Sequence, residues 1–188
     1  RRSVNEPAAQ GRFAHNQGIG DKMAEEKIKI LFVCTGNTCR SPMAEALLRH
    51  EWEKRSGALT LEVLSAGLAA VDGGKASEHA RAVMREAGID LEMHRSALLN
   101  EKLVDEATLI LVMSRQHRQM LLRRFPAAAD KTYLLKDFAG TTGDPDIDDP
   151  FGGTMEDYRR IYEELRAGIE KIAQILEGGK ENGDSPGQ

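Results

Sequence analysis

Short apolar runs alternate with stretches of helical periodicity along this chain. The runs are rich in aliphatic and β-branched residues, as buried strands are, and they span residues 28–33, 61–66, 108–113 and 132–135. Apolar positions with helical spacing fill the intervals between them, at residues 42–56, 76–88 and 115–124. This alternation predicts an α/β fold: a doubly wound, four-stranded parallel sheet with helices on both faces, a flavodoxin-like three-layer sandwich.

The clearest helical pattern comes last. Thr154 and Asp157 resemble a capping box, and apolar residues then recur with a period of 3.6 from Met155 to Leu176. Gly178 and Gly179 are expected to end the helix. The 188 residues fit one domain, which we place at residues 23–178. Polar segments at residues 1–22 and 179–188 are expected to be a disordered N-terminal extension and a disordered tail.

Composition excludes several classes of protein. With 40% hydrophobic and 30% charged residues the chain is typical of globular domains, and its net charge of −4 argues against a nucleic-acid binder. We find no secretory signal and no apolar run of about 18 residues, so no membrane association is expected. Two cysteines, Cys34 and Cys39, cannot form a disulfide framework or a zinc site, which favours the reducing cytoplasm.

The candidate chemistry lies in residues 34–40, which form a Cys-x5-Arg loop directly after the first apolar run. A loop between a strand and a helix can direct its N–H groups at one anion, and the helix dipole adds a positive field. That field favours the thiolate of Cys34, while Arg40 offers two donors to phosphate oxygens. The loop therefore predicts a nucleophile inside a phosphate cradle. The alternative is a structural cysteine at a strand end.

Neighbouring residues support the cradle. Gly36 permits a left-handed backbone, Ser41 is a preferred N-cap, and Pro42 suits the first position of a helix. The residues predicted to bind phosphate are Thr35, Gly36, Asn37, Thr38, Cys39, Arg40 and Ser41. A thiol with a lowered pKa also oxidises readily, so we predict a reversible disulfide between Cys34 and Cys39. The alternative is that Cys39 only fills space as a small apolar residue.

A second constellation lies at residues 143–153, where aspartates, prolines and glycines predict a loop. Asp144 and Asp146 fit a solvated acidic turn. Cleavage of a phosphoryl group requires a proton for the leaving group, and a protonated aspartate held by a neighbouring proline could supply it. The residue types alone do not decide between Asp148 and Asp149. Phe151 could form a wall beside the substrate.

These motifs resemble the low-molecular-weight protein tyrosine phosphatase family over residues 28–176. The resemblance depends on the loop from Cys34 to Pro42, on Ser65-Ala66-Gly67, on His79 and on Asp149-Pro150-Phe151. It implies that Cys34 is the nucleophile, that Arg40 binds phosphate and the transition state, and that Asp149 is the general acid and then the base. It also implies that Asn37, Ser41, Ser65 and His79 brace the loop by hydrogen bonds.

Two positions resemble the bacterial protein-arginine phosphatase branch of this family. Thr38 stands where tyrosine-specific members carry a bulky aliphatic residue, and Phe151-Gly152 replaces their paired tyrosines. The predicted activity is therefore hydrolysis of phosphoarginine on proteins through a phosphocysteine, with Thr38 and Phe151 setting specificity. Phosphotyrosine hydrolysis is the alternative. An arsenate reductase would need further cysteines, and a binding module would need neither thiol nor acid. The resemblance implies no metal or cofactor, and we expect a monomer.

Overall fold

The computed structural model describes residues 27–55 and 59–178. The extensions predicted at residues 1–22 and 179–188 lie outside the described residues, as does the start of the predicted domain at residues 23–26. The strands are β1 (Lys27–Cys34), β2 (Thr60–Gly67), β3 (Leu109–Val112) and β4 (Thr132–Leu134). They form one parallel sheet in the order β2-β1-β3-β4, with β1 and β3 in its centre. The predicted four-stranded parallel sheet is confirmed.

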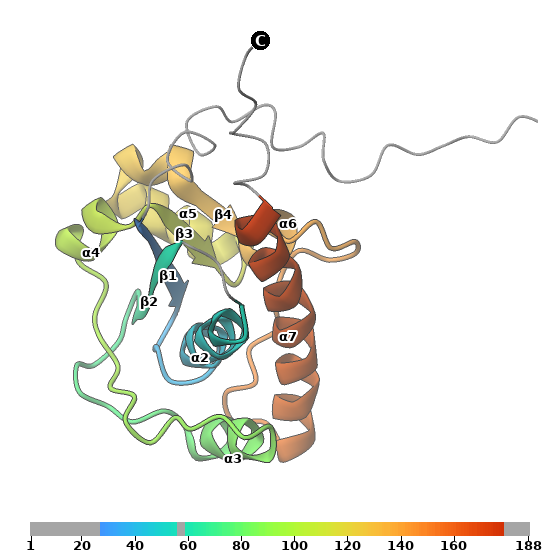
Figure 1. The fold of residues 1–188 in the computed structure, drawn as a ribbon. Helices are drawn as coiled ribbons and strands as arrows, with labels where there is room; N and C mark the ends of the chain where they lie inside the picture. The colour runs from blue at the N-terminus through green and yellow to red at the C-terminus, as the bar shows by residue number, and fades with distance from the viewer. Residues whose placement is uncertain (1–26, 56–58, 179–188) are drawn as a thin grey trace, which may run out of the picture.

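Helices cover both faces of this sheet (Figure 1). They are α2 (Arg40–Glu53), α3 (Glu78–Glu86), α4 (Glu101–Glu106), α5 (Arg115–Arg124), the 3₁₀ helix η3 (Pro126–Lys131), α6 (Leu135–Phe138) and α7 (Met155–Gly178). The prediction for residues 115–124 coincides with α5. Helices α4 and α6 were not predicted from the sequence, because their six and four residues are too few to show a helical period.

Side chains of β1 alternate between two cores, because successive residues of a strand point to opposite faces. Ile28, Ile30 and Phe32 pack in the core on the side of α2 and α7. Leu31 and Val33 pack in a smaller core with residues of α4 and α5. All five are essentially inaccessible to solvent. The carboxyl end of β1 is thereby held from both sides, and this is where Cys34 lies.

Helix α7 begins with the predicted capping box. The Thr154 N–H donates to Asp157 Oδ2 at 2.8 Å, and the Asp157 N–H donates to Thr154 Oγ1 at 3.3 Å. The apolar stripe of α7 then packs mainly on α2, with its first turns beside α3. The prediction for this helix is confirmed.

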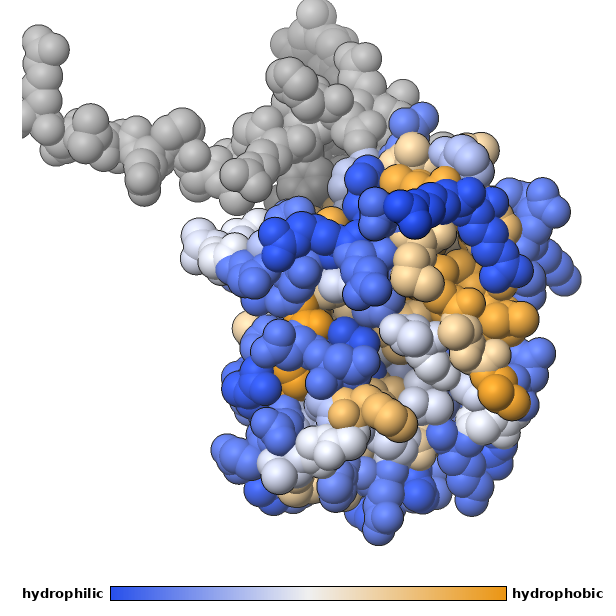
Figure 2. Space-filling model, turned by 180° about the vertical axis from the view of Figure 1, so that it is seen from behind, coloured by the Kyte–Doolittle hydropathy of each residue, from blue (hydrophilic) through white to orange (hydrophobic). Residues whose placement is uncertain are grey.

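The outer surface is largely hydrophilic, with apolar side chains gathered between charged ones on the face that Figure 2 shows. Among the described residues, large hydrophobic side chains are exposed at Val71, Met93, Leu98, Met120 and Phe151. Within residues 27–55 and 59–178, no helix has the length and apolar character needed to cross a membrane.

Candidate active site

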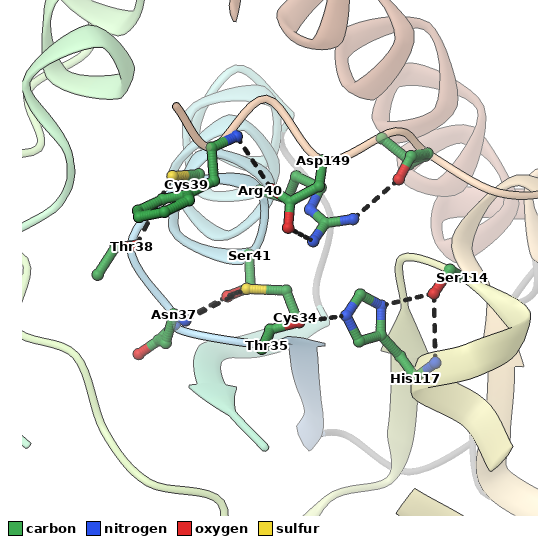
Figure 3. A network of polar contacts seen from close by, with 12 residues as sticks. Cys34, Thr35, Asn37, Thr38, Cys39, Arg40, Ser41, Ser114, His117 and Asp149 are labelled. Atoms are coloured by element: carbon green, nitrogen blue, oxygen red, sulfur yellow. Dashed lines mark hydrogen bonds and ion pairs between the residues drawn. The ribbon is translucent and has the colours of Figure 1, made fainter. Parts of the chain in front are cut away.

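Cys34 is the last residue of β1, and its thiol is 3% exposed. Its Sγ lies 2.9 Å from Ser41 Oγ and accepts the Asn37 N–H at 3.3 Å (Figure 3). The Ser41 oxygen already accepts a hydrogen bond from Asn37 Nδ2 at 2.8 Å, so the serine hydroxyl is free to donate to sulfur. Two donors directed at Sγ stabilise the thiolate.

Asn37 organises the loop around that sulfur. Its Nδ2 also donates to Ser65 Oγ at 2.9 Å, and its Oδ1 accepts the Ala97 N–H at 2.9 Å. The side chain is completely buried, and these bonds satisfy its polar atoms. Asn37 also carries the left-handed backbone of the loop, with φ of 54°. The expectation that Gly36 does so was wrong; asparagine tolerates this region better than most residues.

The start of α2 differs from the prediction as well. The helix begins at Arg40 with Cys39 as its N-cap, and no side chain caps it. Ser41 is therefore not the N-cap, because its hydroxyl is engaged by Cys34 and Asn37. A first turn without a side-chain cap leaves backbone N–H groups for an anion, which suits a phosphate cradle.

Strand β2 supports the loop from the side. Ser65 Oγ bonds Asn37 as described and donates to Glu45 Oε2 at 2.5 Å. Gly67 lies so close that a Cβ there would be 2.6 Å from the Thr35 carbonyl oxygen. This close approach is the physical reason for glycine after Ser65-Ala66. It lets the loop at Thr35 pack directly against the end of β2.

The histidines do not follow the prediction. His79 packs edge-on against Tyr158, with ring centroids 5.2 Å apart, and makes no hydrogen bond to the loop within the described part of the chain. Two other histidines hold the loop instead. His94 Nε2 lies 2.8 Å from the Asn37 carbonyl oxygen, and His117 Nε2 lies 2.9 Å from Thr35 Oγ1.

Sequence reasoning missed both of these histidines. His94 lies in an irregular segment that carried no signal. His117 lies in the first turn of a predicted helix, just past the carboxyl end of β3, and that edge of a parallel sheet is where ligand contacts collect. Burial, and then the nearby positive charge of Arg40, lower the pKa of His117 to about 4. Its imidazole is therefore neutral at pH 7.

Arg40 is buried beside the thiol, with 5% exposure. Its Nη1 donates to the Ile147 carbonyl oxygen at 2.9 Å, and its Nη2 lies 2.8 Å from Asp149 Oδ2. Its buried Nε has no hydrogen-bond partner in the described chain. A phosphoryl oxygen in the cradle would satisfy this donor, which otherwise carries a desolvation cost.

The acidic loop is held by ion pairs. Asp144 and Asp146 are not simply solvated, because both bind Arg115, at 3.1 and 3.2 Å. Asp148 points to α7, where it pairs with Arg160 at 3.0 Å. Asp149 pairs with Arg40 and accepts the Phe151 N–H at 3.1 Å. Of the two candidate acids, the geometry places Asp149 at the cradle.

The sequence matches the family described as "Low molecular weight phosphotyrosine protein phosphatase" over residues 29–182, which is more than half of the chain. The chain belongs to this family.

Its relatives include bacterial arginine phosphatases. It is 48% identical to the protein-arginine-phosphatase of Geobacillus stearothermophilus, across 79% of this chain and 96% of the relative. It is 42% identical to that of Bacillus subtilis, across 78% and 95%. The solved YwlE arginine phosphatase from G. stearothermophilus superposes with a TM-score of 0.76 at 45% identity, across 85% of this chain and 99% of that one. A mutant YwlE "with phosphorylated active site serine" has a TM-score of 0.76 at 39% identity, across 82% and 99%.

The second cysteine of this low-molecular-weight phosphatase has other neighbours than the first. Cys39 Sγ lies 3.2 Å from the Tyr158 hydroxyl and 3.4 Å from Ser77 Oγ. Both cysteines are free thiols. The Cys34–Cys39 disulfide stays a prediction, and forming it requires Cys39 to leave Tyr158 and Ser77.

The described residues of this phosphatase contain no group of three or more His, Cys, Asp and Glu side chains that could hold a metal ion. Arg40 is buried in the same loop as the thiol, and its fork can take the role that a metal has in other phosphoryl-transfer sites.

Proposed function

We propose that this protein is a cysteine-dependent protein-arginine phosphatase that works through a phosphocysteine. The observation that carries the proposal is the meeting of three groups at the end of β1. They are a thiol that accepts two hydrogen bonds, a buried guanidinium, and a carboxylate 2.8 Å from that guanidinium. The identity of 48% with a protein-arginine-phosphatase supports phosphoarginine as the substrate.

In the first step, the Cys34 thiolate forms a bond to phosphorus while the P–N bond to the guanidino nitrogen breaks. Backbone N–H groups of the loop and the Arg40 fork hold the phosphoryl oxygens. As these oxygens take Arg40, its pair with Asp149 is replaced, and the freed carboxylate binds a proton from solvent. Asp149 in this protonated form gives the proton to the departing nitrogen. The products of this step are a phosphocysteine and an arginine side chain.

In the second step, Asp149 accepts a proton from a water molecule whose oxygen bonds to phosphorus. The S–P bond breaks, Cys34 returns as a thiolate, and inorganic phosphate leaves. Ser41 and the Asn37 N–H stabilise the departing thiolate. The phosphorylated active-site serine of the related YwlE mutant supports a phosphoryl intermediate on the nucleophile.

Thr38 supports the choice of substrate. It is half-buried at the cradle, and its side chain is smaller than the aliphatic residues of tyrosine-specific members and carries a hydroxyl. A guanidinium has only N–H donors, so an oxygen acceptor suits it better than an apolar wall does. Phe151 is 78% exposed and can cover the aliphatic part of the arginine side chain.

Phosphotyrosine is the second candidate, because the matching family is described by that substrate. The test is kcat/KM on two peptides of identical flanking sequence, one with phosphoarginine and one with phosphotyrosine. We expect the phosphoarginine peptide to be preferred. A preference for phosphotyrosine would reject the arginine assignment but keep the phosphatase mechanism.

We further propose a monomer in the cytoplasm that acts on phosphorylated proteins. Two free thiols in one loop suit a reducing compartment, where thiols persist.

A further inference from the structure

The side chains of the cradle loop differ sharply in exposure. Cys34, Asn37, Cys39 and Arg40 are at most 5% exposed. Thr35 is exposed to solvent. A substrate side chain that enters over Cys34 therefore meets Thr35 before it meets most of the loop.

The Thr35 hydroxyl is held by a buried imidazole. His117 is 5% exposed, and its two ring nitrogens lie 2.9 Å from Thr35 Oγ1 and 2.9 Å from Ser114 Oγ (Figure 3). Ser114 is the N-cap of α5 and accepts the His117 backbone N–H at 3.2 Å. An exposed threonine with a buried histidine behind it has one fixed hydroxyl orientation rather than three free ones.

We propose that Thr35, oriented by His117, is a second specificity-determining residue, and that its oxygen accepts an N–H from the guanidinium of the substrate. This inference rests on the proposed function, since it assumes phosphoarginine as the substrate. Substrate specificity then depends on Thr35 and on His117 behind it, as well as on Thr38.

A neutral imidazole has one donor and one acceptor nitrogen, so His117 donates to one of the two hydroxyls, Ser114 or Thr35, and accepts from the other. The inference concerns the tautomer that carries its proton on Nδ1. When Nδ1–H donates to Ser114 Oγ, Nε2 accepts the Thr35 O–H, and both lone pairs of Thr35 remain for the substrate. A protonated ring would donate at both nitrogens and take up one of those lone pairs. Burial of His117 and the charge of Arg40 keep the ring neutral.

The chemical basis for selection is a difference in donors. The guanidinium part of phosphoarginine carries several N–H donors and no acceptor, whereas the phenyl ring of phosphotyrosine offers no donor to the wall of the site. Thr35, Thr38 and Asp149 would supply oxygen acceptors from both loops. When a phenyl ring enters such a site, these oxygen acceptors have no donor to bind. The unpaired acceptors lower the affinity for phosphotyrosine relative to phosphoarginine.

The experiment compares Thr35→Val with Thr35→Ser, using the phosphoarginine and phosphotyrosine peptides described above. Valine keeps the shape and removes the hydroxyl, while serine keeps the hydroxyl. We expect Thr35→Val to lower the ratio of kcat/KM for phosphoarginine over phosphotyrosine by roughly tenfold to hundredfold, through a loss on phosphoarginine. Thr35→Ser should keep this ratio within about threefold of the wild-type value.

His117→Leu tests the positioning role. It removes the acceptor behind Thr35, so we expect a smaller loss that is again confined to phosphoarginine. Adding it to Thr35→Val should cause no further loss in the substrate ratio, because both changes remove the same bond. If His117→Leu does not fold, the two Thr35 variants still decide.

A fall by the same factor on both substrates in Thr35→Val would show that Thr35 only supports the loop, and it would overturn the inference. So would unchanged turnover of phosphoarginine. Failure of the proposed function is a different result from failure of this inference. If the proposed function is wrong, the wild-type protein itself prefers the phosphotyrosine peptide, before any variant is compared.

Discussion

The two loops that form the site are built in opposite ways. Residues 34–41 are mostly buried, and the polar atoms of Asn37 all have partners inside the protein. Residues 143–153 lie largely on the surface and are held by ion pairs of exposed side chains, such as Asp148 with Arg160. The first loop is a buried cradle, and the second is an exposed loop that contacts it through Arg40, which binds both the Ile147 carbonyl and Asp149.

This difference matches the demands of the reaction. An oxyanion cradle stabilises a transition state best when its donors are already oriented, and buried, fully bonded groups provide that. In the proposed mechanism, Asp149 exchanges two partners, Arg40 in the free protein and the leaving group in the complex. Asp149 is half exposed and Ile147 is buried, so Ile147 anchors the loop while the Asp149 side chain can change partners.

Removing the nucleophile tests the cradle most directly. We expect Cys34→Ser to lose roughly 10⁴–10⁶-fold in turnover while it still binds a phosphate analogue, because the donors of the loop remain. Steady-state kinetics and calorimetry with inorganic phosphate measure the two quantities. Substantial residual turnover would contradict the covalent mechanism.

Replacing Asp149 tests the role of the loop at residues 143–153. Asp149→Asn should lose about 10²–10⁴-fold in kcat, since asparagine cannot donate a proton to the leaving nitrogen. Asp148→Asn is the matched control, and its pair with Arg160 lies on the surface, so a change of less than about threefold is expected. A larger loss for the control would assign the proton transfer to Asp148.

His117 lies where both loops meet, and its charge state links stability to pH. Its pKa is lowered to about 4 in the folded protein, so below about pH 6.5 the unfolded chain takes up a proton there that the folded protein does not. This contribution to stability is present at pH 7 and is lost as the pH falls towards 4. Between pH 7 and 4.5 wild type should lose about 2–3 kcal/mol more unfolding free energy than His117→Gln.

Denaturant unfolding of both proteins at the two pH values measures this difference, and contributions from all other groups cancel between them. A parallel decline of the two proteins would mean that His117 is protonated normally in the folded state.

Thr38 lies at the wall of the cradle, and its expected effect on turnover is smaller than those of Cys34 and Asp149. Thr38→Ile should shift the ratio of kcat/KM for phosphoarginine over phosphotyrosine by roughly 10–200-fold towards phosphotyrosine. The branched side chain presses on a polar guanidinium and offers an apolar face to a phenyl ring. Thr38→Ser serves as the control that keeps the hydroxyl. An unmoved ratio in Thr38→Ile would leave Thr38 without a role in specificity.

Much of the fold and the cradle could be predicted, because the signals are local. The four strands and the long helix α7 have apolar patterns of the right period, and the capping box of Thr154 and Asp157 spans four consecutive residues. The cradle from Cys34 to Ser41 likewise folds from adjacent residues, a strand end followed by a helix start. Within it, the left-handed residue was misplaced by one position, from Asn37 to Gly36.

The sequence by itself therefore determined the reactive groups of the site, which are a thiol and an arginine in a cradle between a strand and a helix. Residue types and periodicity did not decide which distant side chains complete it; the family resemblance favoured Asp149, and the tertiary structure showed all of these contacts. Asp149 rather than Asp148 faces Arg40, and His94 and His117 rather than His79 hold the loop. These contacts join residues 57 to 109 positions apart, and no periodicity along the chain encodes them. They follow from the way β3, α5 and the acidic loop pack around the carboxyl end of β1.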